Sequence, residues 1–248
     1  MPSWTDEGFV ISSRLHGENN AIIGLFTAEH GRHMGLLHAA SSASKKALIE
    51  PGNLVTADWR ARLDEQLGTY QFELQKSYSA TMLDDALKLA ALSSVCALLE
   101  QALPEREPQI AIFNATAALF DVLHLSDDIA QWMVIYLKWE IGMLQALGFG
   151  LELTRCAVSG DEAALAYVSP RSGHAVSRHH AGPYESRLLA LPACLGGDRE
   201  VADELEAGLA LTGHFLKRHI FALIHKDLPQ PRIRLAYLVA NGYKHTSS

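Results

Sequence analysis

Four positions in the second half of the chain have the spacing of a zinc site. Cys156 and Ser159 form one pair separated by two residues, and Ser177 and His180 form a second. Cysteines at all four positions would give the C-x2-C and C-x2-C pairs of a zinc ribbon. Serine hydroxyls are poor zinc ligands, so only Cys156 and His180 of this set could coordinate a metal. We therefore expect a small loop module held by packing, with no metal and no cofactor.

The thiol of Cys156 and the imidazole of His180 also have the chemistry of a hydrolase pair. That chemistry requires the two groups to lie within hydrogen-bonding distance of each other. A second histidine motif, His30-Gly31-Arg32-His33, lacks the glutamate and the helical setting of a metalloprotease. The sequence contains no glycine-rich nucleotide motif, nucleophile elbow or paired acidic motif. It therefore predicts a binding protein, with a hydrolase as a minor alternative.

Basic and aromatic side chains in the first 80 residues could bind an anionic polymer. Proteins that hold single strands combine a positive groove with aromatic rings on which bases stack. The candidates for DNA contact are Arg14, Arg32, Lys45, Lys46, Trp59, Arg60 and Arg62. Lys45 and Lys46 are the strongest candidates, because they lie in a polar connection where a structural role is least expected. Trp59, Tyr70 and Phe72 fall in expected strands and suit the core equally well.

A second basic segment covers residues 207–248, where six Lys and Arg residues accompany one acidic residue, Asp227. An acidic peptide with an apolar end requires a hydrophobic pocket with a basic rim. The candidates for such a pocket are Phe215, Lys217, Arg218, Phe221 and Arg232. A solvated helix face is the alternative explanation for this run of charge.

The elements that must position these groups change in character near residue 80. Before it, runs rich in β-branched and aromatic residues between turn signals predict five strands. The expected strands are 8–16, 21–27, 32–38, 53–62 and 68–77. With a short helical connection between the third and fourth strands, this is the order of an oligonucleotide/oligosaccharide-binding (OB) barrel. Other small five-stranded barrels share the order.

After residue 80, apolar residues recur at helical spacing. The expected helices are 83–101, 109–123, 129–147, a long helix from residue 200, and 232–240. The helix over 129–147 is apolar on nearly all sides and should be buried. Residues 150–197 are rich in glycine and proline and predict a loop-rich insert. The sequence thus predicts an α+β protein with domains at 1–80 and 81–248.

The composition agrees with a folded protein. Of 248 residues, 48% are hydrophobic and 20% charged, and the net charge is −7, which excludes disorder or a coiled coil as the main architecture. No apolar run reaches the roughly 18 residues of a membrane-spanning helix, and the first residues lack the features of a signal peptide. Cys96, Cys156 and Cys194 are too few for a disulfide framework. We therefore expect a reduced, cytoplasmic setting.

Several strings of the sequence resemble the bacterial RecO family of DNA repair proteins, in its alphaproteobacterial form. They occur in the same order over nearly the whole chain. The strings are WTDEGFVIS (4–12), LFTAEHGRH (25–33), LDEQLGT (63–69), LGFGLELTRCAVSG (147–160), AYVSPRSGHAVS (166–177) and LTGHFL (211–216).

The resemblance implies an N-terminal OB barrel and a helical domain with an inserted zinc-ribbon-like module that has lost its cysteines. It also implies a recombination mediator without catalysis, which binds single- and double-stranded DNA and anneals complementary strands. Such proteins contact the acidic C-terminal tail of single-stranded-DNA-binding protein. With RecR, and in some pathways RecF, they help load RecA onto gapped DNA in the nucleoid. A protein-binding adaptor with little DNA binding is the alternative.

Overall fold

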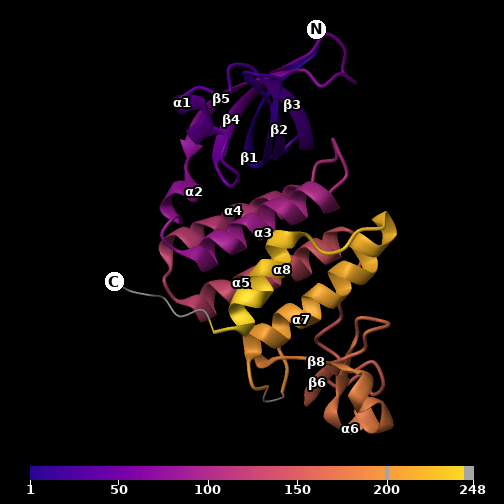
Figure 1. Ribbon diagram of the computed structural model, residues 1–248. Helices are drawn as coiled ribbons and strands as arrows, with labels where there is room; N and C mark the ends of the chain where they lie inside the picture. The colour runs from indigo at the N-terminus through magenta and orange to yellow at the C-terminus, as the bar shows by residue number, and fades with distance from the viewer. Residues whose placement is uncertain (199–200, 243–248) are drawn as a thin grey trace. The chain divides into compact units, whose positions relative to one another are not determined.

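The computed structural model of the chain describes residues 1–198 and 201–242 and divides into two compact units (Figure 1). The first unit contains residues 1–125 and 229–235, and the second contains 126–228 and the described residues after 235. Two predicted features extend beyond the described residues. These are the start of the long helix at residue 200 and the end of the basic segment, residues 243–248.

The first unit contains a closed five-stranded sheet. Its strands and short helix are β1 (Ser3–His16), β2 (Asn20–Thr27), β3 (Gly31–Leu37), α1 (Ala43–Leu48), β4 (Leu54–Arg60) and β5 (Thr69–Lys76). The strand order is β1-β2-β3-β5-β4, and β4 pairs with β1 to close the sheet. Neighbouring strands are antiparallel except β3 and β5, which are parallel and paired at Leu36 and Thr69. The five predicted strands and the short helix between the third and fourth are confirmed.

Strand β1 is longer than predicted because it pairs with two different strands. Its first half, from Ser3 to Phe9, pairs with β4, and its second half, from Gly8 to His16, pairs with β2. A side chain at Gly8 would collide with Thr27, since a Cβ there would lie 2.8 Å from the threonine Cγ2. The predicted start at residue 8 was wrong because the preceding polar residues resemble a loop.

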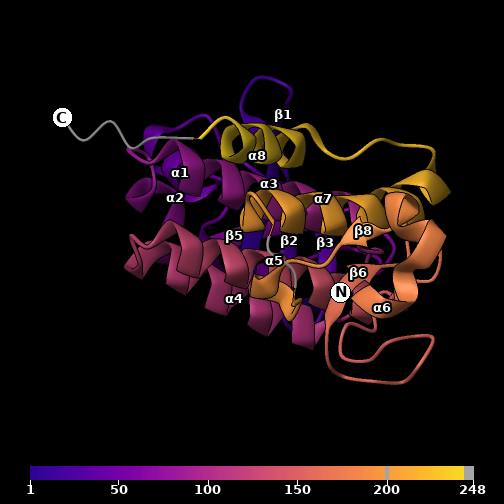
Figure 2. The ribbon, with the colours of Figure 1, turned by 90° about the horizontal axis from the view of Figure 1, so that it is seen from below.

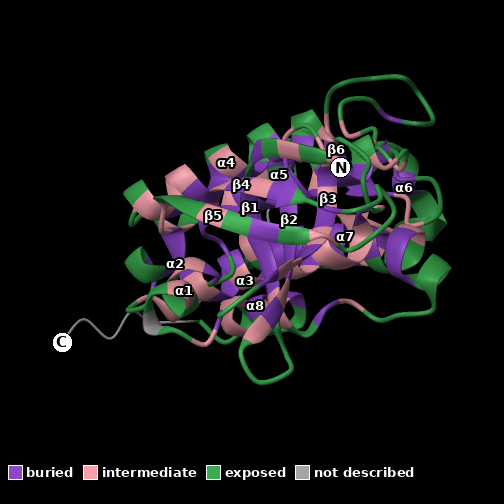
Figure 3. Ribbon diagram, turned by 90° about the horizontal axis from the view of Figure 1, so that it is seen from above, coloured by how far each residue is buried: buried purple, intermediate pink, exposed green. Residues whose placement is uncertain are grey.

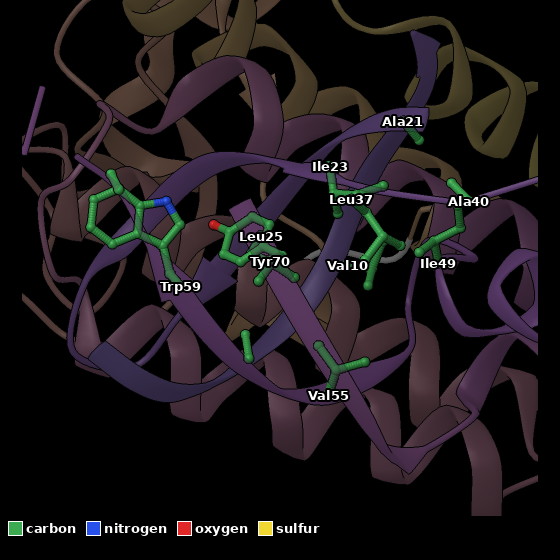
Figure 4. Packing of buried hydrophobic residues seen from close by; sticks show 12 residues of the cluster. Val10, Ala21, Ile23, Leu25, Leu37, Ala40, Ile49, Val55, Trp59 and Tyr70 are labelled. Atoms are coloured by element: carbon green, nitrogen blue, oxygen red, sulfur yellow. The ribbon is translucent and has the colours of Figure 1, made fainter. Parts of the chain in front are cut away.

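The inward faces of the strands form one hydrophobic cluster. Its members are Val10, Ala21, Ile23, Leu25, Leu37, Ala40, Ile49, Val55, Ala57, Trp59, Ala61 and Tyr70. Figure 4 shows Trp59 and Tyr70 toward one end of the interior, with Ala40 and Ile49 toward the other. Gly35 leaves space for the phenol of Tyr70, because a Cβ at this glycine would lie 2.3 Å from the ring. Figure 3 shows buried residues alternating with more exposed ones along the strands.

Three helices complete the main part of the first unit: α2 (Tyr78–Thr81), α3 (Ala86–Ala102) and α4 (Ile110–Leu125). The Asp85 side chain caps α3 by accepting hydrogen bonds from two backbone N–H groups of its first turn. Helix α3 packs against β1 and β2, and the ring of Phe9 contacts those of Phe113 and Phe120 on α4. By these contacts, α3 and α4 belong with the sheet in the first compact unit (Figure 1).

The segment between α3 and α4 lies along the beginning of β3. Glu105 forms an isolated parallel bridge with Arg32, and the backbone N–H of Arg106 donates to the carbonyl of Arg32 at 2.8 Å. Gly31 has a φ of +64° and permits this approach, because a Cβ there would lie 2.0 Å from the carbonyl oxygen of Glu107.

The second unit is centred on α5 (Ile129–Ala146) and α7 (Glu204–Leu216). Helix α5 is largely buried, as its composition predicted, and its Glu140 carboxylate accepts a hydrogen bond from Thr212 on α7 at 2.5 Å. The long helix predicted from residue 200 is shorter, because the Asp203 side chain caps α7 by accepting from the N–H of Glu206. A π-helical turn (η3, Lys217–Phe221) and a 3-10 turn (η4, Ala222–Ile224) follow.

The predicted loop-rich insert contains a small three-stranded sheet. It consists of β6 (Leu165–Val168), β7 (Ala175–Ser177), α6 (Arg178–Ala181), η1 (Gly182–Arg187), β8 (Leu189–Ala190) and η2 (Ala193–Leu195). The strands are ordered β7-β6-β8. Figure 2 shows this module beyond one end of α7, within the second unit. Its strands have only two to four residues, too few for a periodic pattern to identify.

The last helix, α8 (Gln230–Ala240), begins directly after Pro229 and is shared between the two units. Its position agrees with the predicted short C-terminal helix. Across the described parts of the chain, no helix has the length and apolar character needed to cross a membrane.

Candidate nucleic-acid interface

The β1–β2 turn and the segment leading into α1 form a polar end of the closed sheet. Ser41 donates a hydrogen bond to Asn19 at 2.9 Å, and His38 Nδ1 lies 3.3 Å from Asn20 Oδ1. Lys45 Nζ donates to the carbonyl of His38 at 2.7 Å. These contacts hold the two segments together. They also position the predicted lysine pair at the surface of this end.

We call this end the lysine end and define it by His16, His38, Lys45 and Lys46. Lys46 and both histidines are exposed, and Lys45 is half-buried. These side chains offer several cationic or hydrogen-bonding groups within one polar surface. The arrangement agrees with phosphate contact, although the contact itself stays a prediction.

The other basic candidates for DNA contact in this unit differ in their exposure and in their partners within the protein. Arg14, Arg60 and Arg62 are all exposed, and Arg14 also forms an ion pair with Glu100 at 2.6 Å. Arg32 is half-buried and has partners within the protein, and its contact with DNA stays a prediction. Its Nε donates to the carbonyl of Leu103 at 2.8 Å, and its guanidinium pairs with the carboxylate of Glu105. Arg32 thus holds the segment after α3 against the sheet.

Trp59 is corrected, because its ring belongs to the interior of the sheet. The residue is 2% exposed, and its indole N–H donates to the carbonyl of Leu67 at 3.0 Å. It cannot present an open ring face at the surface for a base. Tyr70 is buried in the same cluster, and Phe72 is half-buried against it.

A pocket of about 410 Å³ opens above Trp59, at the end of the sheet opposite Ala40 and Ile49. We call it the Trp4 pocket; its lining includes Trp4, His30, His33, Trp59, Asp64 and Arg106. The Trp4 ring stacks on His30, with centroids 4.3 Å apart, and on Trp59, with centroids 5.6 Å apart. Sequence reasoning missed Trp4, His30, His33 and Arg106 as site residues. A predicted strand that began at Ser3 and paired with β4 would have placed Trp4 opposite Trp59.

His33 is a neutral group in this pocket at physiological pH. Burial, together with the nearby charges of Arg106 and His30, lowers the pKa of the His33 imidazole to about 4. Its Nδ1 lies 2.9 Å from the hydroxyl of Tyr70. Burial also raises the pKa of the Tyr70 phenol well above its usual value. The two side chains therefore form an uncharged hydrogen-bonded pair.

The proposed peptide pocket is corrected at Phe215, Phe221 and Arg232. Phe215 and Phe221 are fully buried, and Arg232 of α8 is 1% exposed. They cannot line an open pocket in this structure. The predicted apolar face of the helix is instead its packing face.

Residues 217–226 follow α7, and we call them the 217–226 turn. This turn exposes other apolar side chains beside the candidate cations Lys217 and Arg218. Lys217 and Arg218 are exposed, and Lys217 pairs with Asp227 at 3.0 Å. Leu223 is 67% exposed and Ile224 is 43% exposed. Sequence reasoning missed these two residues because it treated the segment as a continuous helix. The helix in fact ends at Leu216.

The four positions with zinc-site spacing come together around Cys156. The backbone N–H of Ser177 donates to Cys156 Sγ at 3.3 Å, and His180 Nδ1 lies 2.8 Å from Ser177 Oγ. Burial opposes ionisation of the thiol, but hydrogen bonds from Ser177 and Ser159 outweigh it and lower the pKa of Cys156 to about 6. His180 bonds to Ser177 and not to Cys156, so the hydrolase pair is not formed.

The donor set of this module does not fit zinc, because two of its four positions are serine hydroxyls. Within the described ranges, no group of three or more His, Cys, Asp or Glu side chains could hold a metal ion. The absence of stoichiometric zinc stays a prediction.

Comparison with known proteins gives matches along nearly the whole chain. Residues 1–78 match the family model of the recombination protein O N terminus, and residues 83–229 match that of its C terminus. The DNA repair protein RecO of Rhodospirillum centenum is 53% identical over 234 residues, 93% of this chain and 92% of the relative. RecO of Rhodospirillum rubrum is 45% identical over 239 residues, which are 94% and 95% of the two chains. RecO of Cereibacter sphaeroides is 45% identical over 244 residues, 98% of this chain and all of the relative.

Proposed function

Because the chain belongs to the recombination protein O family of DNA repair proteins, we propose that it acts as a recombination mediator. In this role it binds single- and double-stranded DNA and anneals complementary strands. Together with RecR and RecF, it helps load RecA onto DNA covered by single-stranded-DNA-binding protein. The role depends on binding without catalysis and belongs in the cytoplasm, at the nucleoid during repair.

The observation that carries this proposal is the family match over both halves of the chain, at up to 53% identity. The closed sheet supports it, and we infer that this sheet is an OB barrel. Its strand order and the helix between β3 and β4 agree with that fold. OB barrels bind single strands through a basic groove and stacking rings.

The basis of DNA affinity in this proposal is local charge. The chain carries a net charge of −7, so phosphate binding must come from clusters of cations. The exposed candidates in the first unit are Arg14, Lys46, Arg60 and Arg62, with Lys45 half-buried. Binding through such contacts is nonspecific in sequence and weakens steeply with salt, because it releases condensed counterions.

Fluorescence anisotropy of a labelled single-stranded oligonucleotide, titrated with the full chain at two salt concentrations, tests the proposal. A mediator should bind at low salt, lose affinity at higher salt and speed the annealing of complementary strands. An adaptor that acts mainly through proteins would leave the anisotropy unchanged at both concentrations. That result would overturn direct DNA binding.

We further propose that the 217–226 turn binds the acidic tail of single-stranded-DNA-binding protein. The support is an exposed apolar pair, Leu223 and Ile224, beside the cations Lys217 and Arg218. An acidic peptide with an apolar end requires both features. The small sheet in the same unit is, in this proposal, a metal-free counterpart of the zinc ribbon.

A further inference from the structure

The Trp4 pocket has the dimensions of a site for a small group. Its volume of about 410 Å³ lies within the range of about 300–1,000 Å³ that ligand pockets occupy. All of its lining residues belong to the first compact unit. The pocket is therefore a feature of the sheet and its loops.

One wall of the pocket is a column of three aromatic rings. The plane of the central ring, Trp4, lies 12° from that of His30 and 17° from that of Trp59. Trp59 is buried and Trp4 lies between the other two rings, so the half-buried His30 forms the open end of the column. Nucleobases stack on such rings with little regard to sequence, because every base has a π face.

His33 provides a second, independent feature. The residue is only 3% exposed, yet it lines the pocket, and its Nδ1 is bonded to Tyr70. The side-chain hydrogen bond of His33 uses Nδ1, and Nε2 is not among the buried unpartnered atoms of the described residues, so it is open to solvent in the pocket. A neutral imidazole presents either a donor or an acceptor at this atom, and a base edge offers both kinds of partner. A bound base would replace water at this atom and bond to it directly.

The charges of the pocket favour a neutral group over a phosphate. Glu29 and Asp64 contribute two carboxylates to its lining, against the one guanidinium of Arg106. That guanidinium already donates to the carbonyls of Asp64 and Gln66 in the β4–β5 loop. A phosphate would meet net negative charge here, whereas an uncharged base would not.

The cations suited to phosphate lie on the chain next to the pocket. Arg60 is the cross-strand partner of Ser3, and the N–H of Ala61 donates to the carbonyl of Pro2 at 3.1 Å. Pro2 and Ser3 both line the pocket. Arg60 and the following Arg62 are exposed, so they can contact the phosphates of a strand whose base enters.

We propose that the Trp4 pocket binds one unpaired nucleobase of single-stranded DNA, with the base stacked on His30 at the open end of the ring column and its edge bonded to His33. This inference rests on the proposed DNA binding and adds a specific place for a base. It predicts that the bases of the DNA, and not only the phosphates, contribute to affinity.

The first test uses the unaltered full chain and two single-stranded oligonucleotides of equal length. One has normal bases and the other carries abasic sites throughout, so that both present the same phosphates. We expect the abasic strand to bind roughly tenfold more weakly, a loss of about 1.4 kcal/mol that lies within the range one stacked base contributes. Equal affinities would overturn the base pocket while leaving DNA binding intact. Failure of both strands to bind would instead overturn the proposed function.

The second test assigns the effect to this pocket. Trp4→Leu should lower the affinity for the normal strand about tenfold, leave that for the abasic strand unchanged and preserve the salt dependence. Tyr184→Leu, which removes an exposed aromatic ring of the other unit, is the matched control and should keep the preference for normal bases. Retention of that preference by Trp4→Leu would contradict the assignment. Ser3→Trp, which narrows the pocket from an exposed position, should reproduce the loss if Trp4→Leu does not fold.

Discussion

Trp4 and Trp59 are direct partners across β1 and β4, and their rings stack with centroids 5.6 Å apart. The relationship depends on the first half of β1, because only that half pairs with β4. The hydrogen bond from the Trp59 indole N–H to the carbonyl of Leu67 fixes the orientation of the Trp59 ring. The buried ring thus supports the half-buried one, and the Trp4 pocket has a rigid floor.

Replacing both Lys45 and Lys46 by alanine should weaken binding to every oligonucleotide by a similar factor. Each phosphate contact contributes about 0.7 to the log–log salt slope for single strands, so the double change should flatten it by roughly one unit. Anisotropy titrations at several salt concentrations measure both quantities. Arg155→Ala is the control, because this arginine is paired with Glu162 in the other unit. Unchanged affinity and slope would move the DNA site toward Lys217 and Arg218.

The buried imidazole of His33 should make stability depend on pH. Its pKa is about 4 in the folded chain and about 6.5 when unfolded, so the unfolded state binds more protons between these values. Its contribution is therefore complete above about pH 6.5 and is lost as the pH falls toward 4.

Urea unfolding at pH 7 and pH 4.5 measures this effect. Between these pH values, the wild type should lose about 2 kcal/mol more stability than His33→Leu. His38→Leu, which removes an exposed histidine, should keep the wild-type dependence. If His33→Leu lost as much stability as the wild type, the imidazole would not be the responsible group.

Binding of an acidic peptide with an apolar C-terminus should depend on the 217–226 turn. Arg218→Glu and Leu223→Asp should each lower the affinity about tenfold or more in calorimetry on the full chain, by charge reversal and by loss of apolar contact. Leu125→Asp alters a similarly exposed leucine of the other unit and should bind as the wild type does. Wild-type affinity in both turn variants would place the peptide elsewhere.

The purified protein should carry no stoichiometric zinc, since Cys156 has only one imidazole and two hydroxyls around it. A triple variant, Ser159→Cys, Ser177→Cys and His180→Cys, should bind about one zinc ion per chain, because these positions already converge on Cys156. Elemental analysis of both proteins measures the number of zinc ions per chain. One zinc in the wild type would contradict the prediction and point to His174 or His179 as ligands.

The strands were predictable because their signals are local. Alternation and turn residues defined five strands, and the strings from Trp4 to Leu216 identified the family. The start of β1 was not predictable from composition, since Thr5, Asp6 and Glu7 read as a loop. Only pairing with β4 makes that segment a strand.

The site residues were harder to predict because burial depends on which side of an element faces the core. Trp59, Phe215 and Phe221 have the right chemistry for binding, but their packing removes them from the surface. Leu223 became a candidate only because the helix ends earlier and a π-helical turn changes the direction of the following side chains. Neither effect leaves a periodic signal in the sequence.

The backbone contact between Arg106 and Arg32 also protects the protein from self-association. Strand β3 pairs with β5 only near Leu36, so its beginning would otherwise expose free N–H and C=O groups. Such groups recruit strands from neighbouring molecules and start aggregation. The segment around Arg106 covers this stretch with a bridge of its own. This edge of the sheet is therefore closed to strand addition by another copy of the chain, even at high local concentration.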